Sequence, residues 1–245
     1  MVSRPPPLPP VRGLDPASLT AWEGRVTAVI QLQGCNFHCP ECPVPHLVPQ
    51  VFGSGTIPVE SVLEAIERRR RWLDGVVIAG GEPTLHEGLR DLVRYVGETG
   101  LRVRLHTNGS RPEMLRTILE GGEVASVSMT VRGPLDPTYA VAVGARVRLA
   151  AVYESIELLL RWPGEHEFRV PWLPNVVERP QMVAVLRMLA GARRVVLQPS
   201  ADGSPGVRAL QQVGREAGPL VDSCVVAGRP GQDFGARAGS RSISR

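Results

Sequence analysis

The chain contains no lysine, so all 28 of its permanently cationic side chains are arginines. This absence excludes catalysis through a Schiff base on a lysine amine. The formal net charge is only +4. The densest run of arginines, residues 68–71, falls late in a predicted helix, where cations meet the partial negative charge of the helix C-terminus. Solvated arginines therefore explain the charge better than a nucleic-acid interface, and we expect no nucleic-acid partner.

The chain also lacks any apolar run close to the roughly 20 residues that a membrane-spanning helix requires. Its first ten residues are rich in proline and contain no apolar segment of the kind found in secretory signals. We therefore expect no membrane association and a cytoplasmic location. Hydrophobic residues make up 43% of the chain and charged residues 21%, which is typical of a globular protein that buries a core.

Three regions are predicted along the sequence. Residues 1–21 form a proline-rich lead-in, which favours loose, extended polyproline geometry. Residues 22–226 form the folded domain. Residues 227–245 are rich in Gly, Arg and Ser without a hydrophobic period, which predicts a flexible tail.

Strand and helix signals alternate through the folded domain, which predicts an α/β protein with a parallel sheet covered by helices. Right-handed crossovers would shape such a sheet into a partial barrel or a doubly wound sheet. In either architecture, function belongs at the C-terminal ends of the strands. The expected strands span residues 26–32, 76–79, 101–106, 124–131, 167–172 and 194–198, and the expected helices span 58–73, 89–97, 112–120, 151–162, 179–190 and 205–216.

Cysteine is scarce but clustered. Of four cysteines, three lie at Cys35, Cys39 and Cys42, in a C-x3-C-x2-C spacing that directly follows the first predicted strand. Three thiolates can hold three irons of a four-iron cluster and leave the fourth iron without a protein ligand. Zinc is the alternative, with His38 or His46 as fourth ligand. Cys224 is distant in sequence and is predicted to be a small, buried apolar residue.

Two further motifs follow predicted strands: Gly80-Gly81-Glu82-Pro83 and Thr107-Asn108-Gly109. Paired glycines let a ligand approach the backbone, and their N–H groups can meet an anion. Glu82 could receive an ammonium group. Each motif alone could be an ordinary turn. Because the carboxyl ends of parallel strands share one edge, we expect all three motifs to meet at one mouth.

The ordered combination of these motifs resembles the radical S-adenosylmethionine (radical SAM) superfamily. Residues 32–37, 74–85, 154–159 and 167–169 further look like the anaerobic ribonucleotide-reductase activating proteins. The resemblance implies a partial (β/α)6 barrel, open on one side, that spans residues 22–226. It also implies that Cys35, Cys39 and Cys42 hold a [4Fe-4S] cluster.

In the same way, the resemblance implies that Gly80, Gly81, Glu82 and Pro83 bind S-adenosylmethionine, with Glu82 facing its amino group. The reaction would be reductive cleavage of this cofactor to a 5′-deoxyadenosyl radical, which abstracts a hydrogen atom. The electron would come from a low-potential donor of the flavodoxin or ferredoxin type. In the activating proteins, the hydrogen comes from a glycine of a partner glycyl-radical enzyme.

The chain departs from the activating proteins at several positions near this cofactor. Glu41 stands where relatives carry an aromatic residue. His106 and Thr130 replace two aspartates, and Arg132 replaces a lysine. Without the aspartates, a monovalent cation site is doubtful. We therefore hypothesise that His106, Arg132 or both supply positive charge to the carboxylate of the cofactor. By position in the motifs, Glu41, His106, Thr107, Asn108, Thr130 and Arg132 are candidate cofactor contacts.

Arg169 and Gln198 are candidate contacts to substrate or cofactor at the ends of later strands. Three functions remain open. The leading prediction is an activase of a glycyl-radical enzyme. The second keeps the radical chemistry but acts on a small metabolite or peptide in a biosynthetic pathway, and the departures above favour it. The third is a non-catalytic iron–sulfur or zinc protein.

Overall fold

A computed structural model describes residues 7–49, 55–200, 202–204, 206–217 and 220–227 of the 245-residue chain. The chain divides into two compact units. The first comprises Met1–Asn36, Val44–Thr107 and Arg111–Ser126, and the second comprises Phe37–Pro43, Asn108–Ser110 and Val127–Arg245. The division passes through the cysteine motif, because Cys35 belongs to the first unit whereas Cys39 and Cys42 belong to the second.

The strands follow one another in sheet order as they do in the chain, from β1 to β8. The pairs β2–β3, β3–β4, β6–β7 and β7–β8 are parallel, and β1 pairs with β2 in the antiparallel direction. Because β1 and β8 are the two ends of this order, the sheet does not close on itself. The predicted α/β class with an open, parallel partial barrel is confirmed, and β2 to β7 are its six expected strands.

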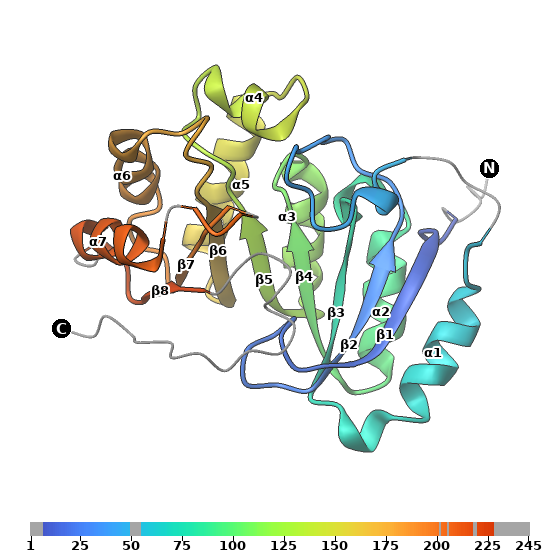
Figure 1. The fold of residues 1–245 in the computed structure, drawn as a ribbon. Coiled ribbons are helices and arrows are strands. Elements are labelled where there is room, and N and C mark those ends of the chain that lie inside the picture. Colours follow the sequence, from blue (N-terminus) through green and yellow to red (C-terminus); the bar gives the residue numbers. More distant parts are fainter. Residues whose placement is uncertain (1–6, 50–54, 201, 205, 218–219, 228–245) are drawn as a thin grey trace. The chain divides into compact units, whose positions relative to one another are not determined.

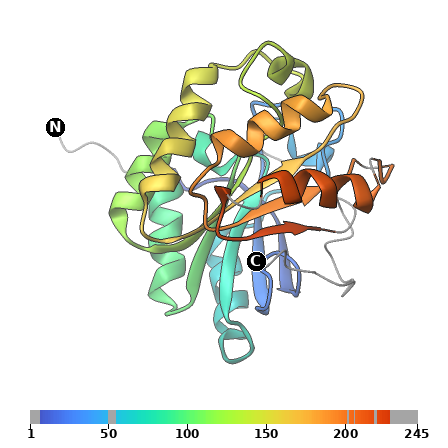
Figure 2. The same cartoon turned by 90° about the vertical axis from the view of Figure 1, so that its left-hand side faces the viewer.

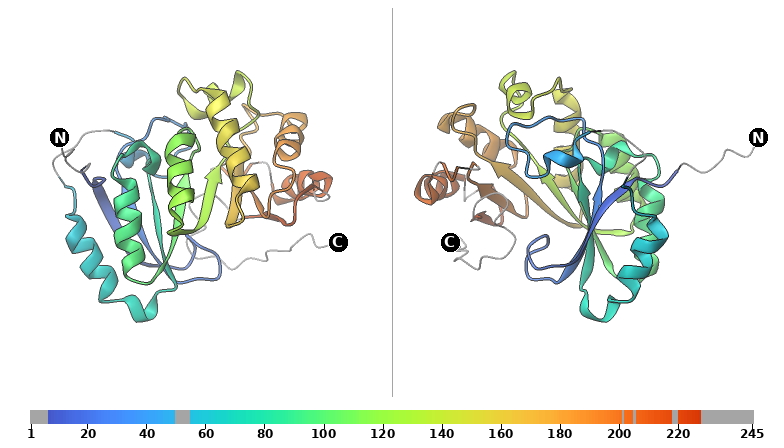
Figure 3. Two further views of the ribbon diagram at one scale, coloured as in Figure 1. Left: turned by 180° about the vertical axis from the view of Figure 1, so that it is seen from behind. Right: turned by 45° about the vertical axis from the view of Figure 1, so that its right-hand side comes forward.

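In the first unit, four strands lie side by side in the order β1 (Val11–Ser18), β2 (Thr27–Leu32), β3 (Gly75–Gly80) and β4 (Arg102–Thr107) (Figure 1). Buried apolar residues of neighbouring strands are in register, as with Ile30, Ile78 and Leu105. Three helices run along one face of these strands (Figure 3). They are α1 (Val59–Glu67), α2 (Leu89–Glu98) and α3 (Pro112–Gly121), and short 3-10 helices lie at η1 (Pro45–Leu47), η2 (Arg70–Trp72) and η3 (Pro83–Leu85).

The second unit begins within β5 (Val124–Thr130), whose last four residues belong to it. Strands and helices then alternate, and α6 and α7 lie side by side (Figure 2). A parallel register pairs Val170 of β6 with Leu197 of β7. The remaining elements are α4 (Thr138–Val143), α5 (Leu149–Arg161), β6 (Glu165–Pro171), α6 (Arg179–Met188), β7 (Val195–Gln198), α7 (Val207–Ala217) and β8 (Cys224–Val226).

Every predicted strand and helix has a counterpart, but among the described residues β1, α4, β8 and the 3-10 helices were not predicted. The loose lead-in is wrong for residues 11–18, which form β1 despite Gly13 and Pro16 because two shifts in register accommodate them. The predicted helix 58–73 ends at Glu67, and a 3-10 turn follows. The short elements α4 and β8 were missed. Residues 228–245 of the predicted flexible tail lie outside the described residues.

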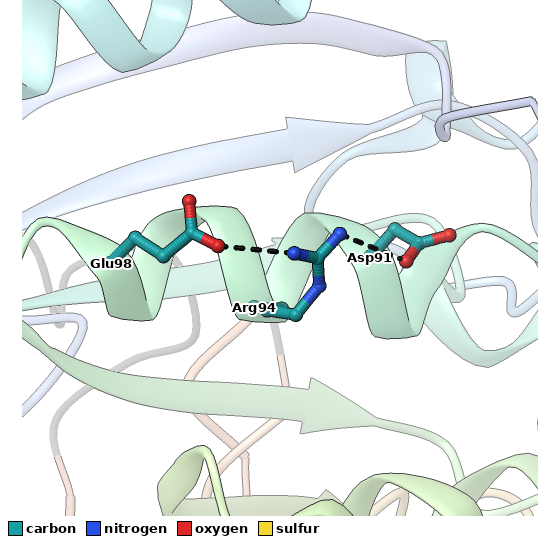
Figure 4. Close-up of polar contacts among 3 residues, drawn as sticks. All are labelled: Asp91, Arg94 and Glu98. Atoms are coloured by element: carbon teal, nitrogen blue, oxygen red, sulfur yellow. Dashed lines mark hydrogen bonds and ion pairs between the residues drawn. The ribbon is translucent and has the colours of Figure 1, made fainter.

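Charged side chains on the helices of the first unit make surface ion pairs. On α2, the guanidinium of Arg94 lies 3.5 Å from Asp91 and 3.1 Å from Glu98 (Figure 4). Such exposed pairs contribute little to stability because water screens them. No helix among the described residues is both long and apolar enough to cross a membrane.

Cys224 is buried in β8, as predicted, and burial raises the pKa of its thiol to about 11.

Candidate functional site

In the first unit, the Gly-Gly-Glu motif packs against the start of the cysteine motif. The N–H of Gly81 donates to the carbonyl of Leu32 over 2.9 Å, and the N–H of Glu82 donates to the carbonyl of Gly34 over 2.8 Å. A Cβ atom at Gly80 would lie 2.3 Å from the Leu32 carbonyl oxygen, and one at Gly81 would lie 2.1 Å from that of Gly34. Glycine is therefore required at both positions, because the backbone of residues 80–81 lies directly against the backbone of Leu32 and Gly34. The expectation that the Gly81 N–H meets an anion was wrong, because the protein itself uses that donor.

The carboxylate of Glu82 is fully buried at the end of β3. Its Oε1 accepts three hydrogen bonds, from the Thr84 backbone N–H (3.1 Å), the Thr84 hydroxyl (2.5 Å) and the Thr107 hydroxyl (2.6 Å). Thr107 ends β4, so this network ties the second and third predicted motifs together at the C-terminal ends of adjacent strands. Three donors on one buried oxygen fix the orientation of the carboxylate.

The backbone around Cys35 is anchored in the same unit. The N–H groups of Gly34 and Cys35 donate to the carbonyls of Leu47 and Val48, over 2.8 Å and 3.1 Å. The returning segment, which contains η1, thus supports the first cysteine. His106, one residue before Thr107 on β4, is half-buried, as is the side chain of Cys35.

In the second unit, Cys39 and Cys42 share a tight turn, in which the N–H of Cys42 donates to the carbonyl of Cys39 over 3.1 Å. Both thiols are half-buried, and neither forms a disulfide. Burial raises the pKa of the Cys39 thiol, and the positive charge of Arg132 opposes that rise. Arg132 therefore favours the thiolate, which is the form that binds a metal.

Glu41 lies within this turn and contacts a distant part of the chain. The Ser200 hydroxyl donates to the Glu41 carboxylate over 2.5 Å. Ser200 follows β7 by two residues, close to the predicted contact Gln198, which is buried at the end of that strand. The cysteine turn is thereby attached to the C-terminal end of β7.

The third motif is divided between the units after Thr107. In the second unit, the Asn108 side chain accepts from the Ser110 N–H over 2.9 Å, and the buried Ser155 hydroxyl of α5 donates to the Gly109 carbonyl over 2.8 Å. Thr130 ends β5 and is half-buried. These contacts shape a turn, which is the alternative that the sequence left open for this motif.

A buried carboxylate outside the predicted site residues, Glu167, lies on β6. Glu167 accepts from the Ser128 hydroxyl (2.9 Å) and from Nε of Arg169 (2.9 Å), and it lies 3.5 Å from Nε of Arg194. Glu167 and Arg169 are two residues apart on one strand, so their side chains share a face. The acidic and basic residues at positions 167 and 169 were the signal for this pair in the sequence. The contact with Glu167 fixes the orientation of the Arg169 guanidinium.

Comparison with known protein families shows to which family this chain belongs. The description of the radical SAM superfamily matches residues 29–161, more than half of the chain. The chain belongs to the radical SAM superfamily. The cofactors predicted from its motifs, a [4Fe-4S] cluster and S-adenosylmethionine, are those of its superfamily.

The relatives of this radical SAM protein fall into two types. It is 31% identical over 127 residues to a Methanocaldococcus jannaschii protein whose name assigns it provisionally to the glycyl-radical enzyme activating enzymes, and the match covers 51% of each chain. It is 35% identical over 92 residues to a 7-carboxy-7-deazaguanine synthase of Synechocystis, covering 38% of this chain and 42% of the relative. The chain thus matches about half, or less, of the length of these curated relatives.

A solved structure shares the fold. The crystal structure of QueE from Escherichia coli superimposes with a TM-score of 0.53, covers 84% of this chain and 87% of its own, and is 19% identical. At that identity the likeness concerns the fold alone, and it agrees with the partial barrel of the radical SAM superfamily.

The residues present suit the cofactors of the superfamily. Cys35, Cys39 and Cys42 form no disulfide, and soft sulfur ligands are those that iron–sulfur clusters use. Among the described residues, the structure gathers no group of three or more His, Cys, Asp or Glu side chains that could hold a metal ion. The predicted site residues group by unit as follows: Cys35, Gly80, Gly81, Glu82, Pro83, His106 and Thr107 in the first, and Cys39, Glu41, Cys42, Asn108, Thr130, Arg132, Arg169 and Gln198 in the second.

Proposed function

We propose that this protein cleaves S-adenosylmethionine reductively and uses the resulting radical to abstract a hydrogen atom from a substrate. When bound, the reduced cluster and S-adenosylmethionine supply the chemistry: one electron breaks the bond between sulfur and C5′, which leaves methionine and a 5′-deoxyadenosyl radical. The electron would come from a donor of the flavodoxin or ferredoxin type. The substrate hydrogen would leave in 5′-deoxyadenosine.

The residues of the chain would bind and orient these groups. Cys35, Cys39 and Cys42 would hold three irons and leave one position open. Glu82 would receive the ammonium group of the cofactor, with Thr84 and Thr107 fixing its carboxylate. The observation that carries this proposal is the fully buried Glu82 carboxylate at the end of β3, which donors from Thr84 and Thr107 hold in one orientation, because an oriented carboxylate can accept charge-assisted hydrogen bonds from an ammonium group.

Arg132 is the candidate for the opposite end of the cofactor. Its charge acts on the Cys39 thiol, so it lies near the cysteine turn within the second unit. A guanidinium there could grip the carboxylate of S-adenosylmethionine in place of a monovalent cation. Arg132→Ala should then weaken binding of the cofactor at least tenfold in equilibrium dialysis, and an unchanged affinity would remove this role from Arg132.

Two substrate classes have support. The activating-enzyme relatives favour a glycine of a partner glycyl-radical enzyme. The 7-carboxy-7-deazaguanine synthase relatives favour a small metabolite. The replacement of aspartates by His106 and Thr130 also separates the chain from the activases. We propose the activase first and the metabolite enzyme second.

The test begins with anaerobic reconstitution by iron and sulfide, followed by dithionite and S-adenosylmethionine. We expect about four irons per chain and formation of 5′-deoxyadenosine. Cys42→Ser should lose both, whereas Cys224→Ser, which removes a buried thiol outside the motif, should keep both. Reconstituted protein that forms no 5′-deoxyadenosine would overturn the proposal in favour of a non-catalytic iron–sulfur protein, and tightly bound zinc would do so in favour of a zinc site.

The substrate class is then separated by two measurements. An activase should produce the doublet signal of a glycyl radical in electron paramagnetic resonance when a glycyl-radical enzyme encoded beside its gene is added. A metabolite enzyme should instead form 5′-deoxyadenosine faster when a cell extract depleted of macromolecules is added. The first result without the second supports the activase, and the reverse supports the metabolite enzyme.

A further inference from the structure

The short helix α4, which the sequence analysis missed, contacts the cysteine turn within the second unit. The N–H of His38 donates to the carbonyl of Val143, the last residue of α4, over 2.8 Å. The ring of Phe37 meets the ring of Tyr139 edge to face, with centroids 6.5 Å apart. Both rings are buried. The two residues immediately before Cys39 therefore rest on α4.

Gly144 brings the end of α4 against this turn. It ends the helix with a φ of +62°, in the left-handed region. A Cβ atom at Gly144 would lie 2.3 Å from the carbonyl oxygen of His38 and 3.0 Å from its carbonyl carbon. Real Cβ atoms do not approach backbone atoms so closely, so any larger residue would displace the backbone beside Cys39.

The helix itself is well anchored. At its start, the carboxylate of Asp136 accepts from the Thr138 N–H over 2.8 Å and from the Thr138 hydroxyl over 2.6 Å. Tyr139 is fully buried, and burial raises the pKa of its hydroxyl. The phenol therefore stays neutral and acts as packing. Because α4 is held in place, a larger residue at its end would move the contacting segment of Phe37 and His38 and leave the helix where it is.

We propose that α4 and Gly144 form a seat that positions Cys39 for binding the iron–sulfur cluster. Gly144 is thus a positioning residue, which acts through the backbone of His38. The inference rests on the proposed function, since it assigns a role towards the cluster. It extends the site to a helix outside all three strand-end motifs.

An ordinary helix-terminating glycine would look similar in sequence. Such a glycine is required only for its positive φ, and asparagine tolerates that conformation with little strain. Gly191 is a matched example within the second unit, because it has a φ of +88° and no atom within 4 Å of where its Cβ would lie. Asparagine at Gly191 tests the need for a positive φ alone. Asparagine at Gly144 tests the need for a positive φ together with the need for space beside His38.

The experiment compares Gly144→Asn with Gly191→Asn and the unmodified chain. For each protein, thermal unfolding is measured on one sample without iron. A separate, folded sample is reconstituted anaerobically with iron and sulfide. Iron content, visible absorption and the electron paramagnetic resonance spectrum of the reduced cluster are recorded. We expect Gly191→Asn to match the unmodified chain, and Gly144→Asn to bind at least threefold less iron or to give a shifted spectrum. Thermal unfolding before reconstitution should show that both variants are folded at the reconstitution temperature, with Gly144→Asn less stable because its Cβ displaces the backbone of His38.

Equal iron content and identical spectra in both variants would overturn the proposal that α4 and Gly144 position Cys39. If Gly144→Asn does not fold, Phe37→Leu takes its place, since it removes the ring contact to Tyr139 but keeps an apolar side chain. A cluster content at least twofold lower supports the seat in that variant, and an unchanged content overturns it. Failure of the unmodified chain to bind any cluster would instead overturn the proposed function, and the seat with it.

Discussion

Replacement of Thr107 by valine tests the network around Glu82 with almost no change in shape. The Thr107 hydroxyl donates to the Glu82 carboxylate over 2.6 Å, and both side chains are buried. A hydrogen bond to a charged acceptor contributes about 1.5–3 kcal/mol to stability, and a buried acceptor that loses a donor keeps its desolvation cost. Two of the three donors remain on Thr84, so we expect Thr107→Val to lower the free energy of unfolding by about 2 kcal/mol.

The measurement is urea unfolding followed by circular dichroism, before iron is added. Thr27→Val is the matched control, because Thr27 is also buried on a strand of the first unit but donates only to the neutral Ser18 carbonyl at 3.5 Å. A bond so long and neutral should contribute about 0.5 kcal/mol or less.

The two variants should also differ in function. After reconstitution, Thr107→Val should bind S-adenosylmethionine more weakly than the unmodified chain, and Thr27→Val should bind it normally. Equal losses of stability in the two variants would refute the reasoning, since the charged acceptor would then contribute nothing beyond a neutral one.

Three further predictions concern single contacts of the second unit. Ser200→Ala removes the donor to Glu41 and should lower the free energy of unfolding by about 1 kcal/mol, since the pair is only partly buried; urea unfolding with no change would contradict the tie to β7. Ser155→Ala removes the donor to Gly109 and should lower it by about 1 kcal/mol in thermal unfolding, and an unchanged midpoint would contradict this. Burial lowers the pKa of His166 below its usual 6.5, so below that pH the unfolded state binds more protons and stability falls as pH falls. His166→Gln should flatten this dependence in urea titrations below pH 6.5, and an unchanged slope would count against it.

The strand-end motifs were predictable because each depends on local signals. Val76 to Ala79 is a short apolar run that ends at two glycines, and such a pattern indicates a buried strand followed by a tight turn. The two glycines do allow a close approach, and in the structure it is the backbone of Leu32 and Gly34 that lies against them. Sequence alone does not reveal that the neighbour of Gly81 is the carbonyl of Gly34.

Short elements escaped prediction for a physical reason. The six residues of α4 alternate Ala and Val at its end, which suits a strand as well as a helix. β8 has three residues, pairs with β7 and packs against α7. Such elements form because tertiary contacts hold them, and their own propensity is too weak to indicate them.

The sequence by itself determined the superfamily, the cysteine spacing and the order of strands and helices, because these depend on residue types at short separations. Tertiary structure alone decided which atoms surround those motifs. Thr107 reaches Glu82 across 25 positions, and Ser200 reaches Glu41 across 159. Contacts between residues so far apart arise only when the strands pair, so no local pattern encodes them. The missing lysine leaves arginine as the permanent cation of this chain, and the fold adds that the charge of Arg132, already a candidate from the sequence, acts on Cys39.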